Sequence, residues 1–434
     1  MTPELVRAIG RRDLTAVVIN SVIGSGIFGL PAIIAALTGA WSPVVVLLAA
    51  MGMVPIALCV AEVGSRFDVA GGPYVYVREA FGGMAGYHVG WLLLSTRLLS
   101  AAAVLNIFTA YLATMLPWVG TPVGRAFAMV LAVAVLTAIN VRGVRQAAWT
   151  VNLFTVAKLL PLLLLVIVGT IAVRGDVLAT QQVAAPRWTD AVLQMVFAFG
   201  GFEVALVAAG ELRRPRQDAA FALIVAIALI TTIYVLVQLA VVGVLPNAAA
   251  SKAPIADALG AIIGPAGATI GGLGAAVSAY GWLTGTALLI PRLPFSMAER
   301  GELPSAFARV HTAFRTPHVA IMACSFAALV LGLLGSFAAT ATLSAIGRLI
   351  VYAMTCGALL VLRKRAAPPA GFILPAGRLF AVIGIVFSIW LLSTRSFAQA
   401  WIIGAIVLAG ALVRGFSVRS SAARRRSPAP PTAP

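Results

Sequence analysis

Four ionisable side chains fall inside long apolar stretches of this sequence, where their chemistry is proton transfer or ion pairing. They are Arg97, Lys158, Glu203 and Arg348. Lys158 lies in "NLFTVAKLLPLLLLVIVG" and Glu203 in "FAFGGFEVALV". A charged group at the centre of a bilayer costs about 3 kcal/mol on insertion scales, so a residue placed there predicts function by default. The structural alternative is a salt bridge from Glu203 to Arg97 or Arg348.

Glycines interrupt the apolar sequence beside Glu203, and a second glycine cluster lies near the start of the chain. The early stretch, Val18 to Ala32, reads "VINSVIGSGIFGLPA", and the later one reads "MVFAFGGFEVALVAAGEL". Backbone amides freed at membrane depth are tolerated only where they line a cavity or bind a polar group. A discontinuous helix whose half-helix ends face a ligand meets that requirement. The alternative is that the small residues only let helices approach closely.

The run "GSGIFG" also fits the dinucleotide-binding pattern Gly-x-Gly-x-x-Gly. That site requires a preceding strand and an acidic residue about 20 positions further on. The next acidic residue here is Glu62, in a separate apolar segment. We therefore interpret the match as chance.

The elements that must hold these groups are membrane-spanning helices. The chain has 434 residues, of which 61% are hydrophobic and 10% charged, whereas soluble domains carry about 25% charged residues. A spanning helix needs about 20 apolar residues, and the sequence predicts twelve such segments and no signal peptide. They are residues 14–39, 43–66, 85–116, 124–141, 147–173, 188–211, 219–245, 265–296, 317–336, 338–362, 378–395 and 397–414.

The distribution of positive charge predicts the orientation of these spans. The net charge is +18, but most lysines and arginines fall in connections on one side, which the positive-inside rule assigns to the cytoplasm. We therefore predict a multi-pass protein of the cell membrane, of a bacterial inner membrane, with both termini cytoplasmic. The lipid bilayer accounts for the charge, and no nucleic-acid partner is expected.

Three stretches resemble the amino acid-polyamine-organocation superfamily, in particular its proton-coupled amino acid transporters. They are "NSVIGSGIFGLP", "FAFGGFEVALVAAGELRRPRQD" and "PRLPFSMAERGELPSAFARVHTAFRTPHVAI". The resemblance implies an all-α, leucine-transporter-type fold with a 5+5 inverted repeat and two additional C-terminal spans. The expected organisation is a cytoplasmic segment 1–13, a first repeat 14–173, a second repeat 188–362, two final spans within 378–414 and a disordered tail 416–434.

The resemblance also assigns site residues. An amino acid carboxylate would bind amides at Gly24, Ser25 and Gly26, because half-helix N-termini carry partial positive charge. The substrate ammonium would bind carbonyls of the preceding half-helices. The complete expected substrate site is Ser21, Val22, Gly24, Ser25, Gly26, Phe197, Gly200 and Phe202.

Lys158 matches the fifth-span lysine that replaces sodium in proton-coupled members, and Glu203 matches a gating or proton-sensitive position. Both are predicted proton-coupling residues. A buried lysine loses hydration in its charged form but gains from nearby carbonyls, so it can release a proton when the first helix moves. Arg97 and Arg348 are not features of the resemblance; either Glu203 or an anionic substrate side chain would suit them.

The expected function is proton-coupled symport of an amino acid or related amine by alternating access. An exchanger or exporter without obligatory proton coupling is the first alternative. A membrane-embedded enzyme is the alternative from another class, but it would need a nucleophile, base or metal cluster at depth, and His88, His311 and His318 fall at span ends. Neither a cofactor nor a metal is expected.

Overall fold

The structure is a computed structural model that describes residues 11–426 apart from Ser25 and the segments 68–71, 144–147, 206–214 and 366–368. Regular structure in this described part is helical, without strands. The α-helices are α1 (Arg11–Val22), α2 (Gly26–Thr38), α3 (Ser42–Gly64), α4 (Pro73–Phe81), α5 (Gly83–Ala113), α6 (Pro122–Arg142), α7 (Ala148–Ile171), α8 (Gly175–Thr180), α9 (Trp188–Phe199), α10 (Phe202–Ala205), α11 (Pro215–Val244), α12 (Pro254–Leu289), α13 (Arg292–Glu299), α14 (His318–Leu334), α15 (Phe337–Leu362), α16 (Gly377–Ser393) and α17 (Phe397–Arg426).

Many of these helices are long and apolar enough to cross a bilayer. Seven helical segments among the described residues meet that test by length and composition, and four shorter apolar helices accompany them. Many of their apolar side chains remain exposed, Ile171 and Phe397 among them. Exposed apolar faces on long helices suit lipid contact, so the chain is a multi-pass membrane protein.

Local sequence explains where several helices begin and end. Thr121 accepts a hydrogen bond from the Gly124 amide at 3.0 Å and so caps α6, which ends at left-handed Gly143. Within α12, Gly264 has a φ of 71° and kinks the helix. The predicted eighth span, 265–296, ends earlier than expected: α12 stops at Leu289 and the short α13 follows.

The end of the chain is more regular than its composition indicates. Helix α17 continues to Arg426, beyond residue 416 where the disordered tail was expected to begin. Ala and Arg are among the strongest helix formers, which explains how a segment without apolar periodicity extends an existing helix.

Two interruptions lie at the centre of the molecule. Helix α1 ends at Val22 and α2 begins at Gly26, while α9 ends at Phe199 and α10 begins at Phe202. Gly201 adopts a φ of 122°, and a Cβ at this position would come within 2.5 Å of the Ser21 carbonyl oxygen. Only glycine fits such a crossing.

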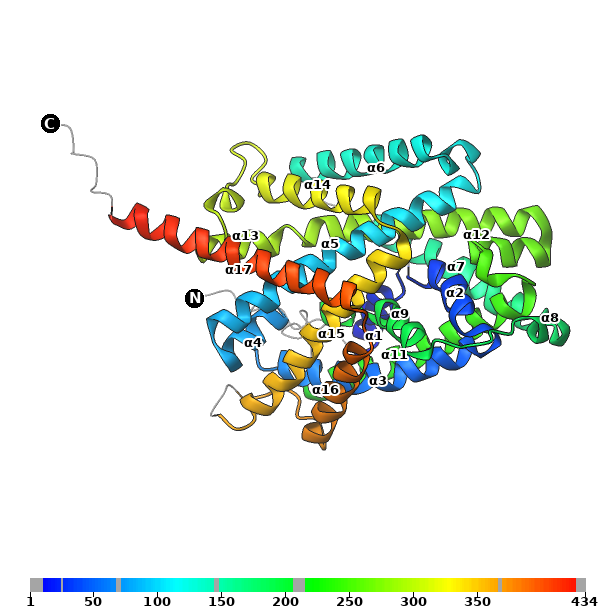
Figure 1. The fold of residues 1–434 in the computed structure, drawn as a ribbon, viewed down its shortest axis with the longest axis horizontal. Helices are drawn as coiled ribbons and strands as arrows, with labels where there is room; N and C mark the ends of the chain where they lie inside the picture. Colours follow the sequence, from blue (N-terminus) through cyan, green and yellow to red (C-terminus); the bar gives the residue numbers. More distant parts are fainter. Residues whose placement is uncertain are drawn as a thin grey trace.

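The neighbouring helices enclose these interruptions. Helix α1 packs against α10 and α11, and α9 packs against α2, α3 and α15. In Figure 1, α4 and α13 lie towards one end of the molecule and α8 lies at the opposite end.

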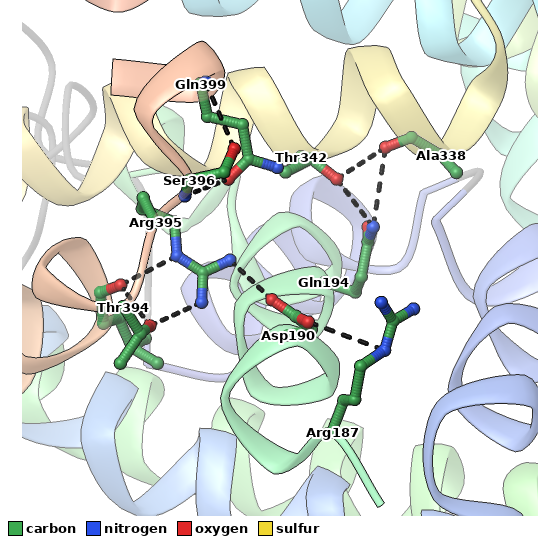
Figure 2. Close-up of polar contacts among 10 residues, drawn as sticks. Arg187, Asp190, Gln194, Ala338, Thr342, Thr394, Arg395, Ser396 and Gln399 are labelled. Carbon is green, nitrogen blue, oxygen red and sulfur yellow. Dashed lines mark hydrogen bonds and ion pairs between the residues drawn. The ribbon is translucent and has the colours of Figure 1, made fainter. Parts of the chain in front are cut away.

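Polar contacts anchor the first turns of α9 (Figure 2). The carboxylate of Asp190 accepts a hydrogen bond from Arg395 at 2.9 Å and lies 3.7 Å from Arg187. Gln194 donates to the Thr342 hydroxyl on α15 at 2.7 Å. These contacts fix the start of α9, the half-helix that leads into the second interruption.

Candidate substrate site

A cavity of about 230 Å³ opens where the two interrupted helices cross. This volume is below the roughly 300–1,000 Å³ of pockets for drug-sized ligands, so it suits a smaller molecule. The ionisable residues that line it are Arg97, Lys158, Glu203 and Arg348. The four charges identified in the sequence therefore meet in one place, although they come from four different helices.

Lys158 closes the C-terminal end of α1. In an uninterrupted helix, the Gly24 amide would donate to the Asn20 carbonyl. Here that amide turns back to the Val22 carbonyl at 2.7 Å, and Lys158 Nζ donates to the Asn20 carbonyl at 2.5 Å. The lysine side chain is only 8% exposed. The interruption thus presents a carbonyl to a buried cation, as expected for the negative end of a helix dipole.

Tyr234, on α11, joins the two interrupted helices. Its hydroxyl lies 3.2 Å from the Val22 carbonyl oxygen and 3.3 Å from that of Ala198, within hydrogen-bonding distance of both. The side chain is fully buried. Tyr234 was not among the residues predicted from the sequence; its one signal was a phenol within an apolar run, because a buried tyrosine hydroxyl usually finds a partner.

Arg348, on α15, lies against the second interruption. Its Nη2 donates to the Ser100 hydroxyl at 3.0 Å, and its guanidinium carbon lies 5.8 Å from the centre of the Phe197 ring. A Cβ at Gly200 would come within 1.4 Å of Nη1. The absence of a side chain at Gly200 is therefore what admits the guanidinium.

Glu203 is oriented by neutral donors. Its Oε2 accepts from the Gly201 amide at 3.0 Å and from the Tyr352 hydroxyl at 3.3 Å. Arg97 and Arg348 interact with it electrostatically, but its described hydrogen bonds come from neither. The expected alternative of a direct salt bridge is thus replaced by longer-range attraction across the cavity.

The predicted substrate residues divide into two groups. Ser21, Gly24 and Gly200 line the cavity. Val22, Gly26, Phe197 and Phe202 are buried and are not among its lining residues, and Ser25 lies outside the described residues.

Backbone groups at the interruptions are partly occupied. The Phe197 carbonyl accepts from the Gly200 amide at 3.3 Å, and the Val22 carbonyl accepts from Gly24 and lies near Tyr234. Each carbonyl oxygen has two lone pairs, so the Phe197 oxygen keeps one for a ligand. The first amides of α2, from Gly26 onward, have no partner within their own helix, as at every helix N-terminus.

A second, larger cavity of about 630 Å³ is linked to the first by an aromatic contact. Phe337 lines this cavity, and its ring meets the Phe197 ring edge-on with the centres 6.0 Å apart. Phe197 in turn lies under Arg348. These two rings therefore form a chain of contacts from Phe337, in the lining of the second cavity, to Arg348, in the lining of the central one.

Among the described residues, no group of three His, Cys, Asp or Glu side chains is placed to hold a metal ion. The site consists of helix ends, one carboxylate and three cationic side chains. Such an arrangement can bind and release a small charged molecule, and it can also hold a proton on Lys158 or Glu203.

The chain is similar in sequence to known proteins over most of its length. A family model described as amino acid permease matches residues 9–413. The chain is 26% identical to the serine/threonine exchanger SteT of Bacillus subtilis, across 94% of this chain and 95% of the exchanger. It is also 26% identical to the branched-chain amino acid permease BcaP of the same organism, across 90% and 88% of the two chains. The human large neutral amino acids transporter small subunit 2 is 28% identical across 73% of this chain and 62% of its own length.

Proposed function

The chain belongs to the amino acid permease family, and we propose that it is a secondary transporter that moves an amino acid together with a proton. The superfamily expected from the sequence motifs is confirmed by the family match over residues 9–413. Its relatives are transporters, which supports transport rather than a membrane-embedded enzyme. Proton coupling is the more specific part of the proposal and rests on the site itself.

The contact between Lys158 and the Asn20 carbonyl carries the coupling proposal. A hydrogen bond from a charged donor contributes about 1.5–3 kcal/mol, against about 0.5–1.5 kcal/mol for a neutral one. Loss of the Lys158 proton would weaken the attachment of α1 to α7 by that difference. A difference of 1.4 kcal/mol changes a conformational equilibrium tenfold, so protonation can bias the position of α1.

The substrate would lie between the helix ends. The first amides of α2, beginning at Gly26, suit its carboxylate, and the carbonyls of Phe197 and Gly200 suit its ammonium group. Gly24 and Ser21 would form the adjoining wall, with Val22 and Phe202 behind it. Ser25 belongs to the same proposed site by its position in the sequence.

The topology is part of the proposal. We assign twelve spans, a 5+5 inverted repeat with two further spans, and both termini to the cytoplasm of a bacterial cell. Paired interruptions in the first and sixth predicted spans support the repeat, because equivalent helices of two repeats should break at equivalent places.

Exchange is the second candidate function. The relative named as a serine/threonine exchanger supports it, and the cavity would serve an exchanger equally well. In an exchanger, Lys158 would fix α1 permanently instead of titrating.

The testing experiment is transport by the purified protein in liposomes. Labelled amino acids are supplied outside, with and without a pH gradient and with empty or preloaded vesicles. Accumulation in empty vesicles that requires the pH gradient supports proton-coupled symport. Uptake that requires preloaded amino acid and ignores the gradient supports exchange, and uptake of no amino acid under either condition contradicts the proposed function.

A further inference from the structure

The central cavity has more positive than negative charge. Its described lining includes Arg97, Lys158 and Arg348 but only one carboxylate, that of Glu203. If Lys158 gives up its proton, the two arginines still outnumber the carboxylate. An ordinary neutral amino acid is a zwitterion, so its binding would leave this excess unchanged.

Within the described ranges, the guanidinium of Arg348 has one nitrogen that is hydrogen-bonded and one that is not. The residue is 8% exposed, and its Nη2 is fixed by Ser100, whose hydroxyl also lies 2.8 Å from that of Ser344. Its Nη1 is buried at Gly200 without a hydrogen-bond partner in the described part of the chain. Leaving a buried donor unpaired costs about 1–3 kcal/mol, and more for a charged group.

Arg97 supplies a second cation at the same place. It lines the cavity, and it interacts electrostatically with both Arg348 and Glu203. Two close guanidinium groups repel each other, and one carboxylate cannot neutralise both. An additional anion between them would relieve the repulsion and also satisfy Nη1.

We infer that the transported substrate is a dicarboxylic amino acid, of the size of aspartate or glutamate, whose side-chain carboxylate binds Arg348 Nη1 and Arg97. The inference rests on the proposed amino acid transport and names its substrate class. The α-carboxylate occupies the N-terminal end of α2, and the second carboxylate reaches across to the guanidinium groups. Carboxylate is the anion that arginine's planar fork of donors matches best in geometry.

The second cavity independently favours an anion. Among the described residues, its lining includes Arg125, Arg187 and Lys252 and no acidic residue. Asp190 offsets Arg187 only in part, at 3.7 Å and with both side chains partly exposed. A cavity lined by one sign of charge raises the local concentration of the opposite ion. An anionic substrate would therefore be concentrated in this second cavity, beside Phe337.

Counterflow in liposomes tests the inference, because it detects both symport and exchange. Vesicles that contain the protein are loaded with one unlabelled amino acid and diluted into the same labelled one. Glutamate and glutamine form the decisive pair, since they match in shape and differ in charge. The expected result is counterflow of glutamate and aspartate that exceeds that of glutamine, serine, leucine and lysine.

Arginine variants test whether these side chains cause the preference for glutamate over glutamine. Arg348→Gln should weaken glutamate binding by about 10- to 100-fold, the value of a lost charged hydrogen bond, and should remove the preference over glutamine. Arg97→Gln provides a second test if Arg348→Gln does not fold. Arg174→Gln is the matched control, because Arg174 is exposed and pairs with Asp176 outside both cavities.

The outcomes separate the two claims. Counterflow of neutral amino acids with no preference for glutamate would overturn the substrate class and leave amino acid transport standing. A glutamate preference that survives both Arg348→Gln and Arg97→Gln would also overturn the inference. If no amino acid undergoes counterflow, the proposed function itself fails.

Discussion

Replacing Tyr234 with phenylalanine should loosen the crossing of the two interrupted helices. The change removes one buried hydroxyl that lies near the carbonyls of Val22 and Ala198, at 3.2 and 3.3 Å. The Val22 carbonyl keeps its hydrogen bond from the Gly24 amide, whereas the buried Ala198 carbonyl loses its side-chain donor, at a cost of about 1–3 kcal/mol. The hydroxyl contacts α1 and α9 at the same time. Its removal therefore destabilises the observed crossing of the two helices relative to states in which they have moved apart.

The lost hydrogen-bond energy sets the expected shift in the position of α1. A loss of 1–3 kcal/mol corresponds to about a 5- to 150-fold shift towards states in which α1 moves away from α9. A cysteine at Ser21, which lines the central cavity, reports this movement through its rate of labelling by a membrane-impermeant maleimide. Cys59, Cys324 and Cys356 are buried and are replaced beforehand to remove background.

We expect at least about a fivefold faster labelling in Tyr234→Phe. Tyr280→Phe is the control, because the Tyr280 ring packs on Phe108 and its hydroxyl bridges neither interruption. Unchanged labelling in Tyr234→Phe, with normal folding, would refute the conclusion that this hydroxyl holds the crossing together.

Three further predictions follow from other contacts. Gly200→Ala places a Cβ 1.4 Å from Arg348 Nη1 and should reduce substrate affinity about tenfold or more by displacing a charged donor; unchanged affinity by calorimetry would contradict this. Glu62→Gln removes the buried partner of Arg363 and should destabilise the protein by about 3–5 kcal/mol, seen as a lower melting temperature; an unaltered melting curve would argue against the pair. Single cysteines at Ala250 and Lys364 should label from opposite sides of the membrane, and labelling of both from one side would overturn the twelve-span topology.

The positions of the interruptions were predictable because their cause is local. Glycines at Gly24, Gly26, Gly200 and Gly201 weaken helices wherever they occur, and the structure interrupts α1–α2 and α9–α10 there. The membrane class was predictable from composition for the same reason. The extension of α17 to Arg426 was missed because a polar composition does not prevent helix growth from an existing end.

The contacts within the site were less predictable because they join distant parts of the chain. Lys158 was identified as a buried cation, but its partner Asn20 lies 138 residues away. Glu203 was given an arginine as its alternative partner, whereas its hydrogen-bond donors in the structure are the Gly201 amide and the Tyr352 hydroxyl. Register and rotation of packed helices decide such pairs, and a single sequence does not specify them.

The sequence shows that Tyr234 is a phenol within an apolar run, but it does not show that the hydroxyl joins two helices. Apolar runs contain other aromatic residues that only pack against neighbours, and the phenol alone does not reveal that two carbonyls converge on it. The same holds for Gly200, whose missing side chain gains meaning only when Arg348 is placed beside it.

The central claim, that Lys158 carries the coupling proton, is tested most directly by proton-driven uptake in Lys158→Ala. Binding and accumulation are measured on the same preparation, with Lys364→Ala as the control because Lys364 is exposed and does not line the cavity. We predict that Lys158→Ala still binds substrate but no longer accumulates it when a pH gradient is imposed, while Lys364→Ala behaves like the unmodified protein. Accumulation by Lys158→Ala against a concentration gradient, driven by the pH difference alone, would contradict the claim.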